Sequence, residues 1–124
     1  MIDKYQTKLY GYKSLFYEFV DIYNRKRLPN KILFSGKKGI GKSTFALHFI
    51  NYIFSGNEEN RYILDSCSIN INNKSYKLIS QNIHPNFYYI KKKLEKKYIE
   101  ISDIRKSIKN NYDLTSYWNQ SFET

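Results

Sequence analysis

Hydrophobic residues recur at helical spacing in two stretches of the chain, and each stretch predicts an amphipathic helix. The first helix should end before the polar residues 24–27. The residues on its apolar face are Tyr12, Leu15, Phe16, Phe19, Val20 and Tyr23. The second helix is predicted over residues 43–54, with Ala46, Phe49, Ile50 and Ile53 on one side. A further helix should begin at Ser102, because serine is a good N-cap, and it would carry Ile104, Arg105 and Ile108.

Short apolar runs predict β-strands at three places. Residues 31–35 follow a turn that contains Pro29 and have the apolar character of a buried parallel strand. Residues 87–90, just after Pro85, predict a second buried strand. Residues 98–101 either pair with that strand or dock against it.

The middle of the chain contains a polar break and an alternating segment. Residues 55–60 are polar, and Gly56 suits the C-terminal end of the preceding helix. Residues 68–76 alternate around Asn72 and Asn73, which predicts a small β-hairpin.

A glycine-rich turn joins the first predicted strand to the second predicted helix, and it fits the phosphate-binding P-loop (Walker A) pattern. The residues predicted to bind nucleotide are Gly36, Lys37, Lys38, Gly39, Ile40, Gly41, Lys42, Ser43 and Thr44. The glycines allow backbone N–H groups to converge on phosphate oxygens, and the helix N-terminus adds its positive dipole end. Lys42 brings a positive charge to the β and γ phosphates, and the Ser43 hydroxyl is the expected ligand of Mg²⁺. The motif reads phosphates alone, so adenine and guanine nucleotides both stay open.

Strand, loop and helix in this order predict an α/β fold, namely the three-layer fold of P-loop NTPases with a parallel sheet flanked by helices. With 124 residues, the chain is short for a complete domain of this kind, so we expect a partial, truncated fold. One domain is predicted over residues 1–124. Its parts are an N-terminal helix and turn (1–30), the strand, loop and helix (31–54), an irregular insertion (55–86), and a strand and helix (87–124).

The formal net charge of +10 favours a nucleic-acid partner. The abundance of Ile, Lys, Asn and Tyr, whose codons are rich in A and T, offers a second explanation, and both stay open. The densest basic cluster, residues 91–97, is predicted to be a solvated loop, with contact to a phosphate backbone as the alternative.

Few residues in the chain are suited to metal binding or nucleophilic chemistry. Cys67 is the single cysteine, which excludes an internal disulfide, and with only His48 and His84 beside it we expect no zinc site. We interpret Cys67 as inert and both histidines as packing or capping residues. No apolar run approaches the roughly 20 residues of a membrane span, and the N-terminus does not have the pattern of a signal peptide, which together predict a cytoplasmic protein.

The order of these pieces resembles the delta-prime subunit of the bacterial DNA polymerase III clamp loader, a member of the AAA+ ATPases. The resemblance spans residues from about Leu9 to Asp113. It rests on residues 28–36, the loop residues 39–43, His84-Pro85-Asn86, and residues 99–105. It implies an ATP-binding subunit that acts in DNA replication by helping to load the sliding clamp.

The resemblance also implies partners. They are other clamp-loader subunits in a hetero-oligomeric ring, with the sliding clamp and primed DNA reached through that complex, and no membrane. It places Leu9, Tyr10 and Gly11 near the nucleotide base.

The sequence departs from the family pattern in two respects. The four-cysteine zinc module of many clamp-loader ATPase domains cannot form, and the acidic strand expected after the Arg105 helix is not found, since residues 63–65 imitate it only poorly. We therefore expect the N-terminal fragment of a longer reading frame, without catalytic residues and with poor nucleotide turnover. The alternatives are a non-hydrolysing structural module that binds nucleotide, and a different small P-loop ATPase or kinase.

Overall fold

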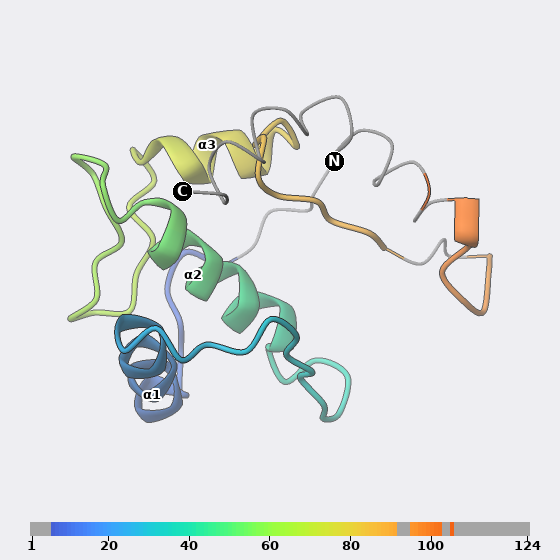
Figure 1. The fold of residues 1–124 in the computed structure, drawn as a ribbon, viewed down its shortest axis with the longest axis horizontal. Helices are drawn as coiled ribbons and strands as arrows, with labels where there is room; N and C mark the ends of the chain where they lie inside the picture. Colours follow the sequence, from blue (N-terminus) through green and yellow to red (C-terminus); the bar gives the residue numbers. More distant parts are fainter. Residues whose placement is uncertain (1–5, 92–94, 103–104, 106–124) are drawn as a thin grey trace. The chain divides into compact units, whose positions relative to one another are not determined.

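The computed structural model describes residues 6–91, 95–102 and 105. In this part of the chain the named elements are three helices, α1 (Lys13–Asn24), α2 (Lys42–Phe54) and α3 (Lys74–Ser80) (Figure 1). The chain divides into two compact units, residues 1–84 and 85–124, and all three helices belong to the first unit. Within that unit, α2 packs against both α1 and α3. The single-domain organisation predicted for the chain stays a prediction.

The two long helices confirm the prediction from hydrophobic spacing. Helix α1 ends in a Schellman motif: the Lys26 N–H donates to the carbonyl oxygen of Tyr23 at 3.0 Å, and the Arg27 N–H donates to that of Ile22 at 3.0 Å. Lys26 takes the left-handed position that glycine usually fills, with φ of 59°. Helix α2 ends at the C-cap Ser55, and Gly56 follows it without a left-handed backbone.

The predicted parallel sheet is wrong, since the described residues contain no strand. Residues 31–35 have no regular secondary structure, and Leu33, placed in a buried strand by the prediction, has 90% of its surface exposed. In the described part of the chain, β-type pairing is limited to two isolated antiparallel bridges, Lys8 with Ser68 and Ile63 with Ser68. The fold of the described residues is therefore helical, and the three-layer α/β architecture is not observed.

The predicted hairpin at residues 68–76 is also wrong. Asn73 is the N-cap of α3, and its side-chain oxygen accepts a hydrogen bond from the Tyr76 N–H at 2.6 Å. Asparagine is favoured both in hairpin turns and at helix N-caps, so the same residue type serves either structure. The segment therefore turns into a helix instead of returning as a strand.

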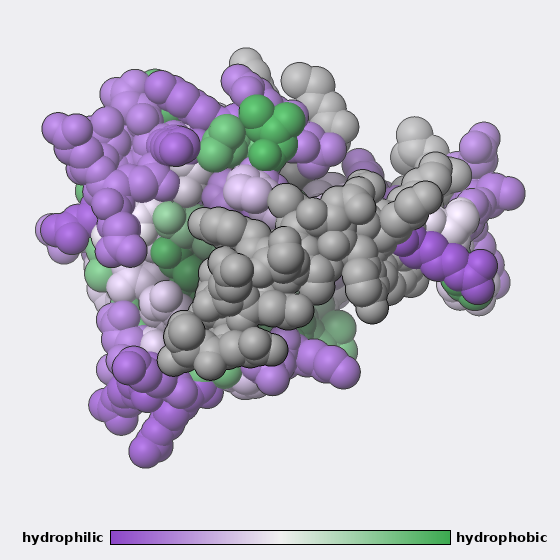
Figure 2. All heavy atoms as spheres, turned by 45° about the horizontal axis from the view of Figure 1, so that its top comes forward, coloured by the Kyte–Doolittle hydropathy of each residue, from purple (hydrophilic) through white to green (hydrophobic). Residues whose placement is uncertain are grey.

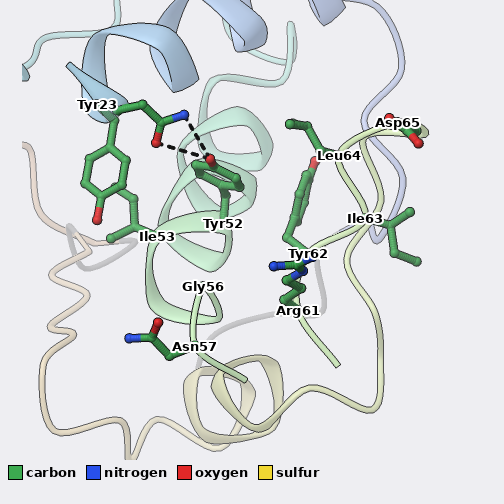
Figure 3. A pocket seen from close by; sticks show the side chains of 11 residues that line it. Tyr23, Tyr52, Ile53, Gly56, Asn57, Arg61, Tyr62, Ile63, Leu64 and Asp65 are labelled. Atoms are coloured by element: carbon green, nitrogen blue, oxygen red, sulfur yellow. Dashed lines mark hydrogen bonds between the residues drawn. The ribbon is translucent and has the colours of Figure 1, made fainter. Parts of the chain in front are cut away.

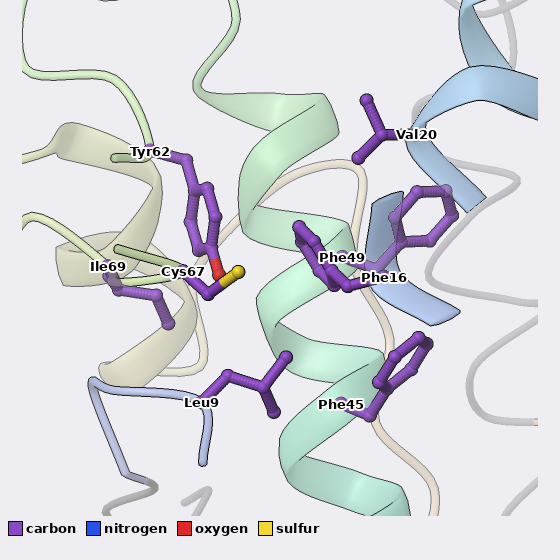
Figure 4. Packing of buried hydrophobic residues seen from close by; sticks show 8 residues of the cluster. All are labelled: Leu9, Phe16, Val20, Phe45, Phe49, Tyr62, Cys67 and Ile69. Atoms are coloured by element: carbon purple, nitrogen blue, oxygen red, sulfur yellow. The ribbon is translucent and has the colours of Figure 1, made fainter. Parts of the chain in front are cut away.

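The core is an aromatic cluster built around α2 (Figure 4). Phe16 of α1 is fully buried, and its ring centroid lies 5.6 Å from that of Phe45 and 6.1 Å from that of Phe49. Both pairs are edge-to-face, a geometry that adds to the free energy gained by burying the rings. The buried residues of this cluster are Leu9, Phe16, Val20, Phe45, Phe49, Tyr62, Cys67 and Ile69.

A buried pair of amides joins α2 to the start of α3. Asn51 donates to the side-chain oxygen of Asn73 at 3.1 Å, and Asn73 donates back to that of Asn51 at 2.9 Å. Asn51 is 0% exposed and Asn73 is 1% exposed, so water cannot replace these bonds. The pair fixes how the two helices meet.

A carboxylate completes the N-terminal end of α3. Glu58 accepts hydrogen bonds from the Lys74 N–H at 2.6 Å and from the Ser75 N–H at 3.3 Å, and it also accepts one from the Ser75 hydroxyl. These N–H groups belong to the first turn of the helix, where no intrahelical acceptor exists. Glu58 therefore ties the turn after α2 to the helix that follows.

The second unit contains no named element among its described residues. Residues 87–90 are irregular, so the strand predicted there is wrong, and residues 98–101 form no strand that could pair with it. Ile101, Ser102 and Arg105 are helical, which agrees with a helix near Ser102. The remainder of that predicted helix, with Ile104 and Ile108, lies outside the described residues.

Candidate functional site

A glycine loop, defined here as residues 36–41, leads into α2. Gly39 and Gly41 have left-handed backbones, with φ of 89° and 95°, and Gly41 is the N-cap of α2. Gly36 has a φ of 155°, and a Cβ built on it would collide with Cδ1 of Ile40. The backbone angles at these three positions therefore favour glycine, whereas the close contact at Gly36 is with the flexible end of the Ile40 side chain, which can move.

Lys42 is the first residue of α2 and closes the loop on itself. Its Nζ donates a hydrogen bond to the carbonyl oxygen of Gly36 at 2.6 Å. The first backbone bond at this end of the helix runs from the Phe45 N–H to the Gly41 carbonyl oxygen at 2.9 Å. The N–H groups that precede Phe45 in the helix have no intrahelical acceptor and point out of its N-terminus. An ammonium group and several amide donors are thus gathered at one place.

Tyr12 ties the glycine loop to the start of α1. Its hydroxyl donates to the carbonyl oxygen of Ile40 at 3.0 Å, and its ring lies edge-to-face with that of Phe45, with 6.4 Å between the centroids. A cavity of about 90 Å³ lies between these groups. Its lining residues are Tyr12, Leu15, Phe34, Ser35, Ile40, Gly41, Lys42 and Phe45.

The structure brings most of the predicted nucleotide-binding residues together at this loop. Ser43 is exposed in the first turn of α2, and Thr44 beside it is half-buried. Lys37 and Lys38 are exposed at the outer side of the loop. Ile40, with 41% of its surface exposed, contributes to the cavity wall. The whole run from Gly36 to Thr44 is therefore one continuous surface feature at the start of α2.

The residues that the resemblance placed near the nucleotide base are more scattered. Leu9 is buried in the core, and its N–H donates to the Cys67 carbonyl oxygen at 2.9 Å. Tyr10 is 66% exposed, and Gly11 has a left-handed backbone with φ of 71°. The neighbouring Tyr12, which the prediction assigned to the apolar side of the helix, is the residue that reaches the loop.

The histidine and the cysteine of the core are held by hydrogen bonds in an apolar setting. His48 is fully buried, with Nε2 at 2.6 Å from the Gln6 carbonyl oxygen and Nδ1 at 2.8 Å from the Tyr62 hydroxyl. Because the carbonyl can only accept, Nε2 carries the proton and Tyr62 donates to Nδ1. Burial lowers the pKa of His48 and raises that of Tyr62. The packing role predicted for His48 is confirmed.

Cys67 is 2% exposed, and its thiol donates to the Leu64 carbonyl oxygen at 3.6 Å. Burial raises the pKa of this thiol, which disfavours the reactive thiolate. His84, whose role as a packing residue was also predicted, stacks on the ring of Phe54 with 4.6 Å between centroids. Among the described residues, no group of three or more His, Cys, Asp or Glu side chains is placed to hold a metal ion.

A larger hollow of about 590 Å³ lies at the other end of α2 and shares no lining residue with the first (Figure 3). The Tyr52 hydroxyl, labelled in Figure 3, and the Asn24 amide are linked by contacts of 3.4 and 3.5 Å. Arg61 and Asp65 supply one charge of each sign to its wall. This hollow therefore has mixed chemistry and does not gather cations as the glycine loop does.

The face drawn in Figure 2 is largely polar. Most of the coloured side chains in Figure 2 are hydrophilic, and the hydrophobic ones form small separate groups. Within the basic cluster at residues 91–97, the described lysines Lys91, Lys96 and Lys97 are exposed, and Lys96 lies 3.6 Å from Glu100. In the part of the chain that the structure describes, no helix has the length and apolar character needed to cross a membrane.

Comparison with known proteins gives one match. The protein-family model described as "DNA polymerase III, delta subunit" matches residues 11–121. The matched range includes the glycine loop and all three helices. Neither a curated protein nor a solved structure matches the chain.

Proposed function

Because the chain belongs to the DNA polymerase III delta subunit family, we propose that it is a clamp-loader subunit that binds ATP and Mg²⁺ at its glycine loop. Within that family, the order of sequence pieces favours the delta-prime type. Its partners are then the other clamp-loader subunits in a hetero-oligomeric ring, and through that ring the sliding clamp and primed DNA. Such a subunit works in DNA replication and in the cytoplasm.

The observation that carries the nucleotide proposal is the position of Lys42. Its Nζ is anchored on the Gly36 carbonyl oxygen at 2.6 Å, across the mouth of the glycine loop. A lysine ammonium group has three N–H donors, so two are left for phosphate oxygens once this bond is made. An anchored cation beside the N-terminus of a 13-residue helix favours a bound phosphate, because both place positive charge at the same point.

The magnesium ion of the nucleotide would be held by Ser43. This hydroxyl is exposed in the first turn of α2, directly after Lys42. Mg²⁺ keeps several of its water molecules and needs few protein oxygens, so one hydroxyl together with the phosphates suffices to hold it.

The proposal is limited to binding. Hydrolysis of ATP also requires a group that orients the attacking water. The cavity beside the glycine loop has no carboxylate among its described lining residues. A structural subunit that binds nucleotide without rapid turnover is thus the form of the proposal that these residues support best.

Titration of the full chain with a fluorescent ATP analogue, with and without Mg²⁺, tests the proposal. Lys42→Ala should weaken binding by about tenfold to a hundredfold, as expected for losing a charge-assisted contact. The control is Lys31→Ala, which makes the same change of net charge at an exposed residue before the loop. Equal affinities for the wild type and Lys42→Ala, or no binding by the wild type, would refute nucleotide binding at this loop.

The clamp-loader part of the proposal needs its own measurement. We expect the full chain to co-elute with the other clamp-loader subunits of the same organism in size-exclusion chromatography. If no mixture with these subunits changes its elution volume, the ring assignment fails, whatever the nucleotide titration shows.

A further inference from the structure

A single hydrogen bond joins the start of α1 to the glycine loop. The Tyr12 hydroxyl donates to the Ile40 carbonyl oxygen at 3.0 Å, although the two residues are 28 positions apart in the sequence. Tyr12 also has a left-handed backbone, with φ of 55°, which is unfavourable for any residue with a Cβ. Such a conformation is strained and persists only where the surroundings hold it.

The Tyr12 ring is fixed on its other side by α2. It lies edge-to-face with the ring of Phe45, at an interplanar angle of 84°, and forms part of the wall of the 90 Å³ cavity. Lys42 and Gly41 belong to the same wall. The hydroxyl of Tyr12 is thus presented to the loop by a ring that packs against the helix carrying Lys42.

The glycine loop is held at two points. The Lys42 ammonium group binds the carbonyl oxygen of Gly36, where the loop begins, and Tyr12 binds that of Ile40, near where the loop ends. Between these points, Lys37 and Lys38 are exposed and Gly39 has no Cβ to restrict its backbone. Glycine has more conformational freedom to lose than any other residue, so a loop of this composition needs external contacts to keep one shape.

We propose that Tyr12 is a positioning residue for the nucleotide, which it serves by holding the glycine loop in its binding shape through the Ile40 carbonyl oxygen. Tyr12 does not have to touch the phosphates. A loop already ordered before binding spends less of its interaction energy on losing conformational freedom, so the ligand is bound more tightly. This inference rests on the proposed nucleotide binding.

The test compares two variants that each remove one tyrosine hydroxyl from α1 or its N-cap. Tyr12→Phe removes the bond to the loop. Tyr17→Phe removes a bond of the same kind, from the Tyr17 hydroxyl to the Leu64 carbonyl oxygen at 3.2 Å, and leaves the loop untouched. Both variants keep their aromatic rings, so both should fold and have similar thermal midpoints.

Two readouts are made on the full chain. The first is the rate of tryptic cleavage after Lys37 and Lys38 without nucleotide, which reports how often the loop opens. The second is the affinity for the fluorescent ATP analogue. Tyr12→Phe should be cleaved about two- to fivefold faster than the wild type and should bind the ATP analogue about two- to fivefold more weakly. Tyr17→Phe should match the wild type in both the cleavage rate and the affinity.

Each outcome decides the inference. Equal effects of the two substitutions would mean that Tyr12 has a merely structural role and would overturn the proposal. Unchanged cleavage, or faster cleavage without weaker ATP binding, would also overturn it. If the wild type binds no ATP, the proposed function fails and this inference fails with it; faster cleavage in Tyr12→Phe would then show only that Tyr12 orders the loop.

Discussion

The buried amide pair between α2 and α3 makes a stability prediction that can be worked out from its geometry. Asn51→Leu keeps the number and branching of the side-chain heavy atoms but removes both hydrogen bonds to Asn73, at 3.1 and 2.9 Å. Each lost bond costs about 1 kcal/mol, and the stranded amide of Asn73, which is 1% exposed, adds about 1 to 2 kcal/mol. We therefore expect the free energy of unfolding to fall by roughly 3 to 4 kcal/mol.

The partner substitution is chosen to keep the helix cap. Asn73 also accepts the Tyr76 N–H at 2.6 Å, and serine at position 73 retains an N-cap oxygen while it cannot reach Asn51. Asn73→Ser alone should also destabilise, because the buried Asn51 N–H group loses its acceptor, while the Asn51 oxygen keeps only the Ser55 hydroxyl at 3.5 Å. The double variant should be less destabilised than the sum of the two single variants by about 1 to 2 kcal/mol, since the shared bonds can be lost only once.

Urea unfolding of the full chain, followed by circular dichroism, measures these free energies at constant m-value. Asn24→Leu is the matched control, because the Asn24 amide also meets its partner Tyr52 in two contacts, but at 3.4 and 3.5 Å and on the exposed surface. It should cost less than about 1 kcal/mol. Single-variant effects at positions 51 and 73 that add within about 0.5 kcal/mol would refute the coupling between the two amides.

Two further predictions concern backbone strain and pH. Lys26→Gly should raise the free energy of unfolding by about 0.5 to 1 kcal/mol, because glycine takes a φ of 59° without strain. Arg25→Gly is the control: its φ of −82° is favourable for any residue, so glycine there should lower the free energy of unfolding in the same urea assay. Burial lowers the pKa of His48 in the folded chain, so as the pH falls the unfolded chain takes up a proton on this imidazole before the folded chain does. The contribution of His48 to the free energy of unfolding should therefore be constant above about pH 6.5 and decline below it. His48→Gln should flatten this slope in urea titrations between about pH 5 and 7.5, and an unchanged slope would contradict the assignment.

Local periodicity was enough to predict the two long helices, and the glycine pattern was enough to predict the loop that leads into the second. Helical spacing depends on residues three and four positions apart, so α1 and α2 are visible in the sequence alone. The left-handed angles at Gly39 and Gly41 likewise follow from residue type, because only glycine takes them without strain. These local features gave the position of the candidate site.

The predicted sheet failed because a strand depends on a partner elsewhere in the chain. The apolar run at residues 31–35 satisfies the pattern of a buried strand, yet only Phe34 packs inward, with its ring centroid 5.7 Å from that of Phe19. Leu33 points to solvent, with 90% of its surface exposed. A short apolar run does not say what, if anything, lies beside it.

The role of Tyr12 was missed for a similar reason. The prediction placed it on the apolar side of a helix, whereas it is the N-cap of α1 with 43% of its surface exposed. Gly11, immediately before it, was the one local indication of a left-handed turn at this point. The acceptor at Ile40 lies too far along the chain for any pattern in the sequence to reveal the contact.

The carboxylate of Glu58 makes the N-terminal ends of α2 and α3 electrostatically different. Both α2 and α3 present first-turn N–H groups, and at α3 these are already taken by Glu58 through Lys74 and Ser75. A dissolved phosphate would have to expel this resident anion from α3, whereas the end of α2 carries the ammonium group of Lys42 in place of a carboxylate. The N-terminal end of α3 is therefore neutralised by a side chain of the protein itself, whereas the N-terminal end of α2 keeps its positive charge.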